Sequence, residues 1–71
     1  MQKPLHETVK EVRQQRGIPQ AVIARKLGIT RQSYASKEAG KSPFYAEDIS
    51  TLAESLVVEP AYFFEKELTN S

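Results

Sequence analysis

The segment from Thr30 to Ser42 concentrates side chains that can form paired hydrogen bonds. Arg31 carries a planar guanidinium that fits the O6 and N7 atoms of guanine, and Gln32 carries an amide that fits the N6 and N7 atoms of adenine. Each well-placed pair of this kind discriminates between bases by roughly 1–3 kcal/mol. The chemistry of this segment therefore favours contact with the edges of nucleic-acid bases.

Catalysis and metal binding have little support in the sequence. His6 is the only histidine, it has no second ligand near it in the chain, and cysteine is absent. Ser33 and Ser36 have no paired base that could activate them as nucleophiles. We therefore expect a protein that is not an enzyme and that has no metal or cofactor site.

A pair of short helices is predicted to present the polar segment. The helix over residues 20–27 has an apolar face of three residues at helical spacing: Ile23, Ala24 and Leu27. Gly28 supplies the turn, and Thr30 is a good N-cap for a second helix over residues 31–39. This is the layout of a helix-turn-helix, here about residues 20–39, whose second helix lies in the DNA major groove.

The remaining chain predicts three more helices, which makes the fold all-α with five helices in one domain, residues 1–71. The first is expected over residues 4–16, the fourth over residues 45–56, and the fifth begins at Pro60. Their inward positions are apolar: Leu5, Val9, Val12, Ile49, Leu52, Ala53, Leu56, Phe63, Phe64 and Leu68. Residues 69–71 are expected to fray.

The charge is distributed unevenly although the formal net charge is only +1. Residues 1–41 hold nine basic and three acidic side chains, a balance of +6, whereas residues 42–71 hold one basic and six acidic side chains, a balance of −5. This asymmetry suggests a basic face for phosphates and an acidic face turned away from them. An ordinary solvated surface that happens to segregate is the alternative.

No apolar run in the sequence is long enough for a signal peptide or a membrane span. The absence of cysteine fits a reducing compartment. We expect a soluble, cytoplasmic protein without a membrane partner.

Residues 5–64 resemble the phage repressor and Cro-type (XRE-like) helix-turn-helix family. The matching residues keep the spacing typical of that family: Val12, Arg13, Gly17, Ile18, Gln20, Ile23, Ala24, Leu27, Gly28, Ile29, Thr30, Arg31, Glu38, Gly40, Lys41, Ile49, Leu52, Ala53, Leu56, Val58 and Phe64. The resemblance implies an ion pair between Arg13 and Glu38 that links the first helix to the end of the third.

Three positions depart from the family pattern. Lys37 stands at a usually apolar site, where its ammonium could extend to a phosphate or the helix could be rotated slightly. Tyr34 is larger than the usual Val or Ile, so its hydroxyl needs a partner or solvent. Val57 replaces the glycine that commonly ends the fourth helix, and we expect a different turn geometry there.

A third helix inserted into the major groove assigns roles to two sets of residues. The residues expected to reach base edges are Arg31, Gln32, Ser33 and Ser36. The residues expected to contact phosphates are Gln20, Thr30, Lys37, Lys41 and Ser42. The alternative for Arg31 is that it binds phosphate alone.

The resemblance implies a transcriptional regulator, a repressor of phage, plasmid or mobile-element type that binds a palindromic DNA operator. A homodimer through the C-terminal region, with Tyr62 and the neighbouring aromatic residues, would place two recognition helices about 34 Å apart. A monomer with partly exposed aromatic side chains is the alternative. Antitoxins, restriction-controller proteins and protein-interaction modules built on the same fold also remain open, and no small-molecule ligand is evident.

Overall fold

The computed structural model describes residues 3–63, and all regular structure in this range is α-helical. The elements are α1 (Leu5–Arg16), α2 (Gln20–Leu27), α3 (Arg31–Glu38) and α4 (Ala46–Leu56), and residues 60–63 are also helical. Each predicted boundary of α1–α4 is met within one residue, and the all-α, five-helix prediction is confirmed. The predicted inward residues Phe64 and Leu68 and the tail lie outside the described residues. None of the described helices is long and apolar enough to cross a membrane.

The turn between α2 and α3 follows from two local signals in the sequence. Gly28 has φ 73°, a left-handed conformation that carries little cost only for glycine. The following amide, that of Ile29, then donates to the carbonyl oxygen of Ala24 at 3.0 Å, which closes the end of α2. Thr30 caps α3, because its hydroxyl oxygen accepts the amide hydrogen of Ser33 at 3.0 Å. Both predictions for this turn are confirmed.

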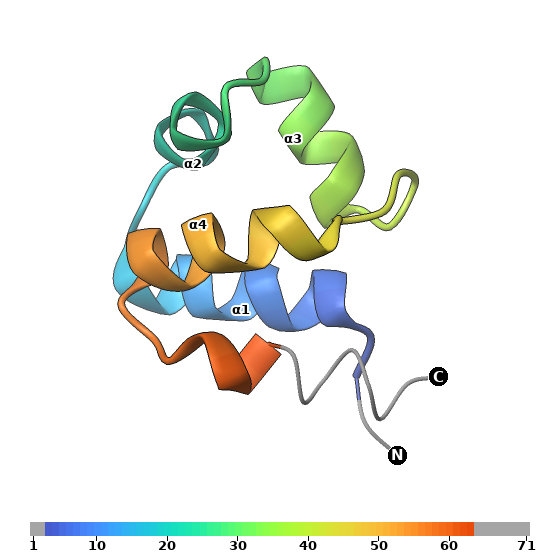
Figure 1. Cartoon of the computed structure of the whole chain (residues 1–71). Helices are drawn as coiled ribbons and strands as arrows, with labels where there is room; N and C mark the ends of the chain where they lie inside the picture. The colour runs from blue at the N-terminus through green and yellow to red at the C-terminus, as the bar shows by residue number, and fades with distance from the viewer. Residues whose placement is uncertain (1–2, 64–71) are drawn as a thin grey trace.

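One apolar core lies beneath the helix-turn-helix pair. Figure 1 shows α2 and α3 together at one end of the molecule, with α4 and α1 below them. The core residues come from every element: Val9, Val12, Ile23, Ala24, Tyr34, Phe44, Ile49, Leu52, Ala53, Leu56 and Phe63. Each large apolar side chain that is fully buried stabilises the fold by about 1.5–3 kcal/mol. Helices α1 and α4 therefore act as the support on which α3 is mounted.

The turn that ends α4 does not have the different geometry expected from its sequence. Val57 adopts the left-handed conformation that glycine would take, with φ 58°. The amide of Val58 donates to the carbonyl oxygen of Ala53 at 2.9 Å, as in a glycine-capped end. The guanidinium of Arg16 donates to the carbonyl oxygens of Leu56 at 2.9 Å and Val57 at 3.1 Å. These contacts from α1 hold the turn and offset its backbone strain.

Candidate nucleic-acid interface

The predicted base-contacting residues lie on the first two turns of α3. Arg31, Gln32 and Ser33 are exposed, and Ser36, one turn further on, is half-buried. The opposite face of the same helix carries Tyr34, which is fully buried in the core. Helix α3 therefore presents a polar outer surface while its inner surface is anchored.

A buried carboxylate connects α3 to α1. Glu38 is 3 % exposed and accepts two hydrogen bonds from Arg13, from Nε to Oε2 and from Nη2 to Oε1, both at 2.8 Å. This bidentate geometry is the stronger form of an Arg–carboxylate pair. The third donor position of Arg13, Nη1, donates to the carbonyl oxygen of Ile18 at 2.8 Å. The ion pair implied by the family resemblance is thus confirmed, and it also holds the segment that leads into α2.

Two further donors complete the environment of Glu38. The hydroxyl of Tyr34 donates to Oε2, and the amide nitrogen of Gln20 donates to Oε1 at 3.0 Å. The predicted need of the Tyr34 hydroxyl for a partner is therefore met inside the protein. The four donor atoms come from α1, α2 and α3, so one carboxylate joins the three helices.

These contacts determine the protonation states of the buried groups. Burial alone would raise the pKa of Glu38, but the hydrogen bonds from Arg13, Tyr34 and Gln20 outweigh it and bring the pKa below its ordinary value. Burial and the neighbouring carboxylate both raise the pKa of the Tyr34 hydroxyl. The hydrogen bonds with Glu38 outweigh the effect of burial on Arg13 and raise its pKa. At neutral pH the site therefore contains a carboxylate, a guanidinium and a neutral phenol.

Gln20 extends this buried network to the recognition surface. Its amide oxygen accepts a hydrogen bond from Nη1 of Arg31 at 3.3 Å. An ionised carboxylate can only accept, so Glu38 requires the NH₂ group of Gln20 and leaves the amide oxygen for Arg31. The predicted phosphate contact of Gln20 stays a prediction, and the structure adds a second role, that of orienting Arg31.

The Lys37 ammonium, which was predicted to contact a phosphate, is held by groups of the protein itself. It donates to the carbonyl oxygen of Pro43 at 2.7 Å and lies 3.7 Å from Oδ2 of Asp48. It also lies 4.5 Å from the centre of the Tyr45 ring. The side chain is 13 % exposed. Lys37 thus fastens the connector between α3 and α4, and we remove it from the phosphate-contacting set.

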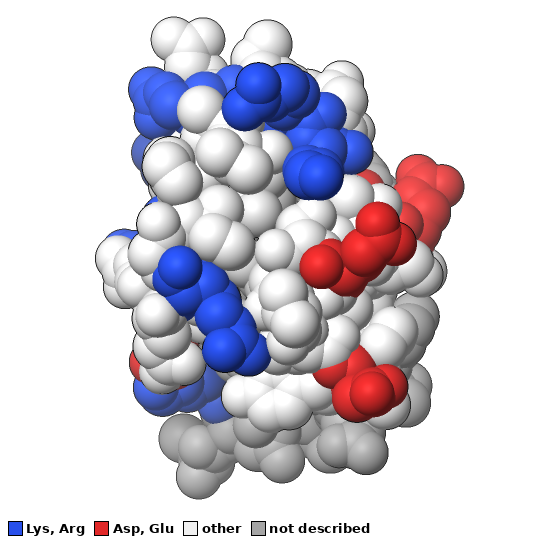
Figure 2. All heavy atoms as spheres, turned by 90° about the vertical axis from the view of Figure 1, so that its left-hand side faces the viewer, with Lys and Arg blue, Asp and Glu red and all other residues white. Residues whose placement is uncertain are grey.

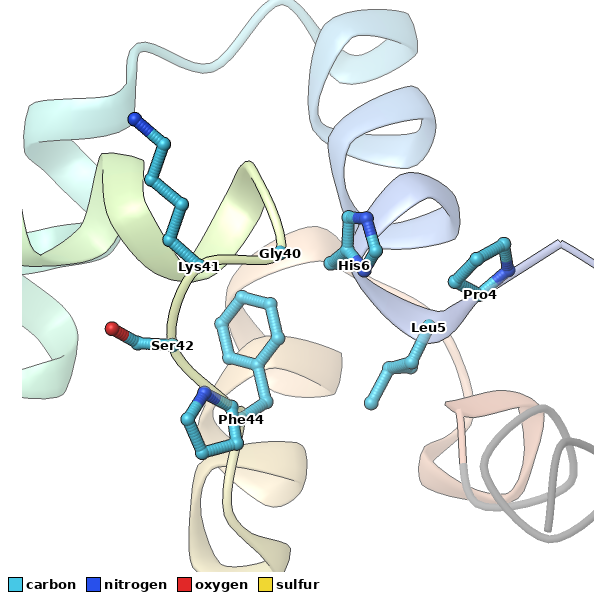
Figure 3. A pocket seen from close by; sticks show the side chains of 8 residues that line it. Pro4, Leu5, His6, Gly40, Lys41, Ser42 and Phe44 are labelled. Carbon is cyan, nitrogen blue, oxygen red and sulfur yellow. The ribbon is translucent and has the colours of Figure 1, made fainter.

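The other predicted phosphate contacts lie at the two ends of α3. Thr30 is exposed at the N-terminus, where its hydroxyl is already used for capping. Lys41 is exposed and Ser42 is half-buried on the connector after the C-terminus. In Figure 3 the Lys41 side chain points away from α1 and His6. The Lys41 amide donates to the carbonyl oxygen of Ser36 at 2.9 Å, which ties the connector to α3.

His6 has a packing role that the sequence did not reveal. Its ring lies against Gly40, as Figure 3 shows, and a methyl group added at Gly40 would lie 2.7 Å from Cε1 and Nε2 of His6. Gly40 also has φ 82°. Among the described residues, no group of three or more histidine or carboxylate side chains could hold a metal ion.

The charges segregate on the surface as well as along the chain. On the face shown in Figure 2, basic side chains gather over α2 at the top of the view, and acidic side chains lie toward α4. Arg25 and Lys26 are exposed basic residues of α2, and Glu47 and Glu54 are exposed acidic residues of α4. On this face the basic side chains of α2 are therefore separated from the acidic side chains of α4, and further basic side chains lie lower in the view.

Sequence reasoning missed the link from Arg31 to Gln20 and the attachment of the Lys37 ammonium to Pro43 and Asp48. One signal for part of the network was available. Tyr34 and Glu38 are four residues apart, a spacing that places two side chains side by side on one helix face. The orientation of the Gln20 amide carried no local signal, since it depends on a carboxylate 18 residues away.

Comparison with known families identifies the domain. The family model described as helix-turn-helix matches residues 9–63, which includes all of α2, α3 and α4 and most of α1. No curated protein matches the chain. The matched range contains the capped turn at Gly28, the polar face of α3 and the buried pair that supports it. The chain therefore belongs to the XRE-type helix-turn-helix family of DNA-binding transcriptional regulators.

Proposed function

We propose that this protein is a sequence-specific repressor of phage, plasmid or mobile-element type that acts in the cytoplasm on a palindromic operator. The observation that carries the proposal is the connection of Arg31, through Gln20, to the buried Arg13–Glu38 pair. A side chain oriented before binding loses less conformational freedom when it meets a base. Such preorganisation suits direct readout better than non-specific attraction to phosphates.

In this proposal α3 lies in the major groove and its first two turns read the bases. Arg31 pairs with guanine and Gln32 with adenine, and Ser33 and Ser36 contact neighbouring base edges. The backbone contacts that set the register come from residues around α3: Gln20, Thr30, Lys41 and Ser42.

The proposed assembly is a homodimer formed through the C-terminal region. Two side chains there are exposed although apolar or aromatic, Val57 at 75 % and Tyr62 at 41 %. Burial of such groups between two copies would favour association. A two-fold axis through this region would give each half of a palindromic operator its own α3, with centres about 34 Å apart.

Binding measured against salt concentration tests the proposal and its residue roles together. A DNA-binding protein should lose affinity linearly in log[salt], and each phosphate contact adds about 0.9 to the slope. Lys41→Ala should lower the slope by about 0.9 per protomer on every sequence, because it removes a phosphate contact alone. Lys37→Met is the matched control, since its ammonium is bound to the connector, and it should leave the slope unchanged.

Two results would contradict the proposal. A flat response of the wild type to salt would leave a protein-interaction module as the better account of the fold. Equal losses of slope for Lys37→Met and Lys41→Ala would show that the slope reports net charge and not the assigned contact.

A further inference from the structure

Three of the four basic side chains in residues 1–16 bind a partner within the protein. Lys3 pairs with Glu11, Arg13 pairs with Glu38, and Arg16 binds the carbonyl oxygens that end α4. Lys10 is the exception. It is exposed, and within residues 3–63 neither an acidic group nor a hydrogen-bond acceptor is paired with its ammonium.

Lys10 lies on a groove that runs between α1 and α3. The side chains that line one hollow of this groove are charged, amide or small: Lys10, Arg13, Gln20, Glu38, Ala35 and Ala39. A second hollow shares Lys10, Glu38 and Ala39 and continues along α1 past Glu7, Glu11 and Gln14, where Glu11 is already paired with Lys3. Because the α3 side of the groove ends in alanine methyl groups, a ligand can approach the helix closely along this side.

A helix in the major groove has a phosphate backbone on both sides. The helix is about 10–12 Å across and the groove about 12 Å wide, so both strands come within reach of long side chains beside the helix. Lys41 follows α3 on the connector, where it lines a hollow together with Leu5 and His6 of α1, and its side chain points away from His6 (Figure 3). Of the residues assigned to phosphates so far, only Gln20 lines the same hollow between α1 and α3 as Lys10.

We propose that Lys10 binds a backbone phosphate on the α1 side of α3, a DNA contact made from outside the helix-turn-helix motif. The inference rests on the proposed function and extends it by one residue. Glu7 lies on the same groove one helical turn before Lys10, and it is exposed. A phosphate held by Lys10 is repelled by Glu7, so the two residues affect DNA affinity in opposite directions.

The test compares Lys10→Gln, Glu7→Gln and the wild type on one selected duplex over a range of salt concentrations. Lys10→Gln should lower the salt slope by about 0.9 per protomer, which corresponds to about fivefold weaker binding per protomer near 0.15 M salt. Glu7→Gln should tighten binding, with the larger gain at low salt. Lys26→Gln is the control, because Lys26 is also exposed but lies on α2 in a hollow formed with Val22 and Arg25.

The outcomes separate this inference from the proposed function. If the wild type binds with a steep salt slope and Lys10→Gln keeps that slope, the Lys10 contact is refuted and the proposed function stands. If Lys26→Gln lowers the slope as much as Lys10→Gln, the effect belongs to net charge and the inference fails. If the wild type binds no duplex, the proposed function itself fails. Melting curves check folding, since substitutions at exposed positions should change stability by less than about 0.5 kcal/mol.

Discussion

Replacing Glu38 with glutamine removes the charge on which α1, α2 and α3 converge. The carboxylate accepts four hydrogen bonds, two from Arg13 and one each from Gln20 and Tyr34. Glutamine has the same shape but offers one oxygen, and its NH₂ group would face other donors. The guanidinium of Arg13, with a side chain 11 % exposed, would lose its counter-charge in a largely buried site.

The loss in the free energy of unfolding caused by Glu38→Gln can be estimated because the Arg13–Glu38 pair is buried. Removing one partner of a buried ion pair costs about 3–5 kcal/mol, and the retained shape of glutamine favours the lower end. A 71-residue domain with about 0.05–0.15 kcal/mol of stability per residue has about 4–11 kcal/mol in total. The substitution should therefore lower Tm by about 12–24 °C, at about 4–8 °C per kcal/mol for a domain of this size.

Thermal and urea unfolding followed by circular dichroism measure this loss. Glu54→Gln on α4 is the matched control, because Glu54 is exposed and its neutralisation should change stability by less than about 0.5 kcal/mol. A loss below about 1 kcal/mol for Glu38→Gln would refute the reasoning, because a value that small is typical of an exposed pair.

The pH dependence of stability provides a second test of the contribution of Glu38. The pKa of Glu38 is lowered in the folded protein from an ordinary value of 4.5, so its contribution to stability is complete above that value. The contribution is lost as the pH falls through the lower, folded pKa. The stability difference between wild type and Glu38→Gln should therefore be constant from pH 7 to about pH 5 and narrow below about pH 4.5. A difference that widened in acid would contradict this assignment.

Two further predictions concern the backbone, and unfolding by urea measures both. Val57→Gly should raise the free energy of unfolding by about 1 kcal/mol, because φ 58° is strained for a β-branched residue and not for glycine. A loss of stability in this variant would show that the turn is unstrained. Gly40→Ala should lower it by more than 1 kcal/mol (about 1–3 kcal/mol), because φ 82° and the close His6 ring both oppose a methyl group. His6→Ala in the same chain should recover the part due to the ring, and the absence of any recovery would assign the whole cost to the backbone.

The elements of this fold were predictable because their signals are local. Gly28 ends α2 and Thr30 caps α3 through conformational preferences that hold in any protein, and the apolar spacing places the core face of α4. The geometry of the turn after α4 was predicted wrongly, although its boundary was predicted correctly, and the reason is physical. A left-handed valine costs only about 1–3 kcal/mol, and the guanidinium of Arg16, 41 residues away in sequence, supplies compensating hydrogen bonds to the turn.

The candidate site was less predictable than the fold because its geometry depends on distant groups. The family resemblance placed Lys37 at a usually apolar site of the third helix, but the position of its ammonium depends on the path of the connector and on Asp48. The pair between Arg13 and Glu38 was predictable only through resemblance, since the two residues are 25 positions apart. The link from Gln20 to Arg31 required the orientation of one amide group, which the network around Glu38 determines.

Selection of bound duplexes from a random DNA pool, with the wild type and with Arg31→Ala, tests the central claim most directly. The account predicts that the wild type enriches a two-fold symmetric site with half-sites about one helical turn apart. It also predicts that Arg31→Ala enriches the same site with one base pair per half-site relaxed, at a cost of about 1–3 kcal/mol. Recovery of no common sequence by the wild type, or of an unchanged sequence preference by Arg31→Ala, would contradict readout by α3.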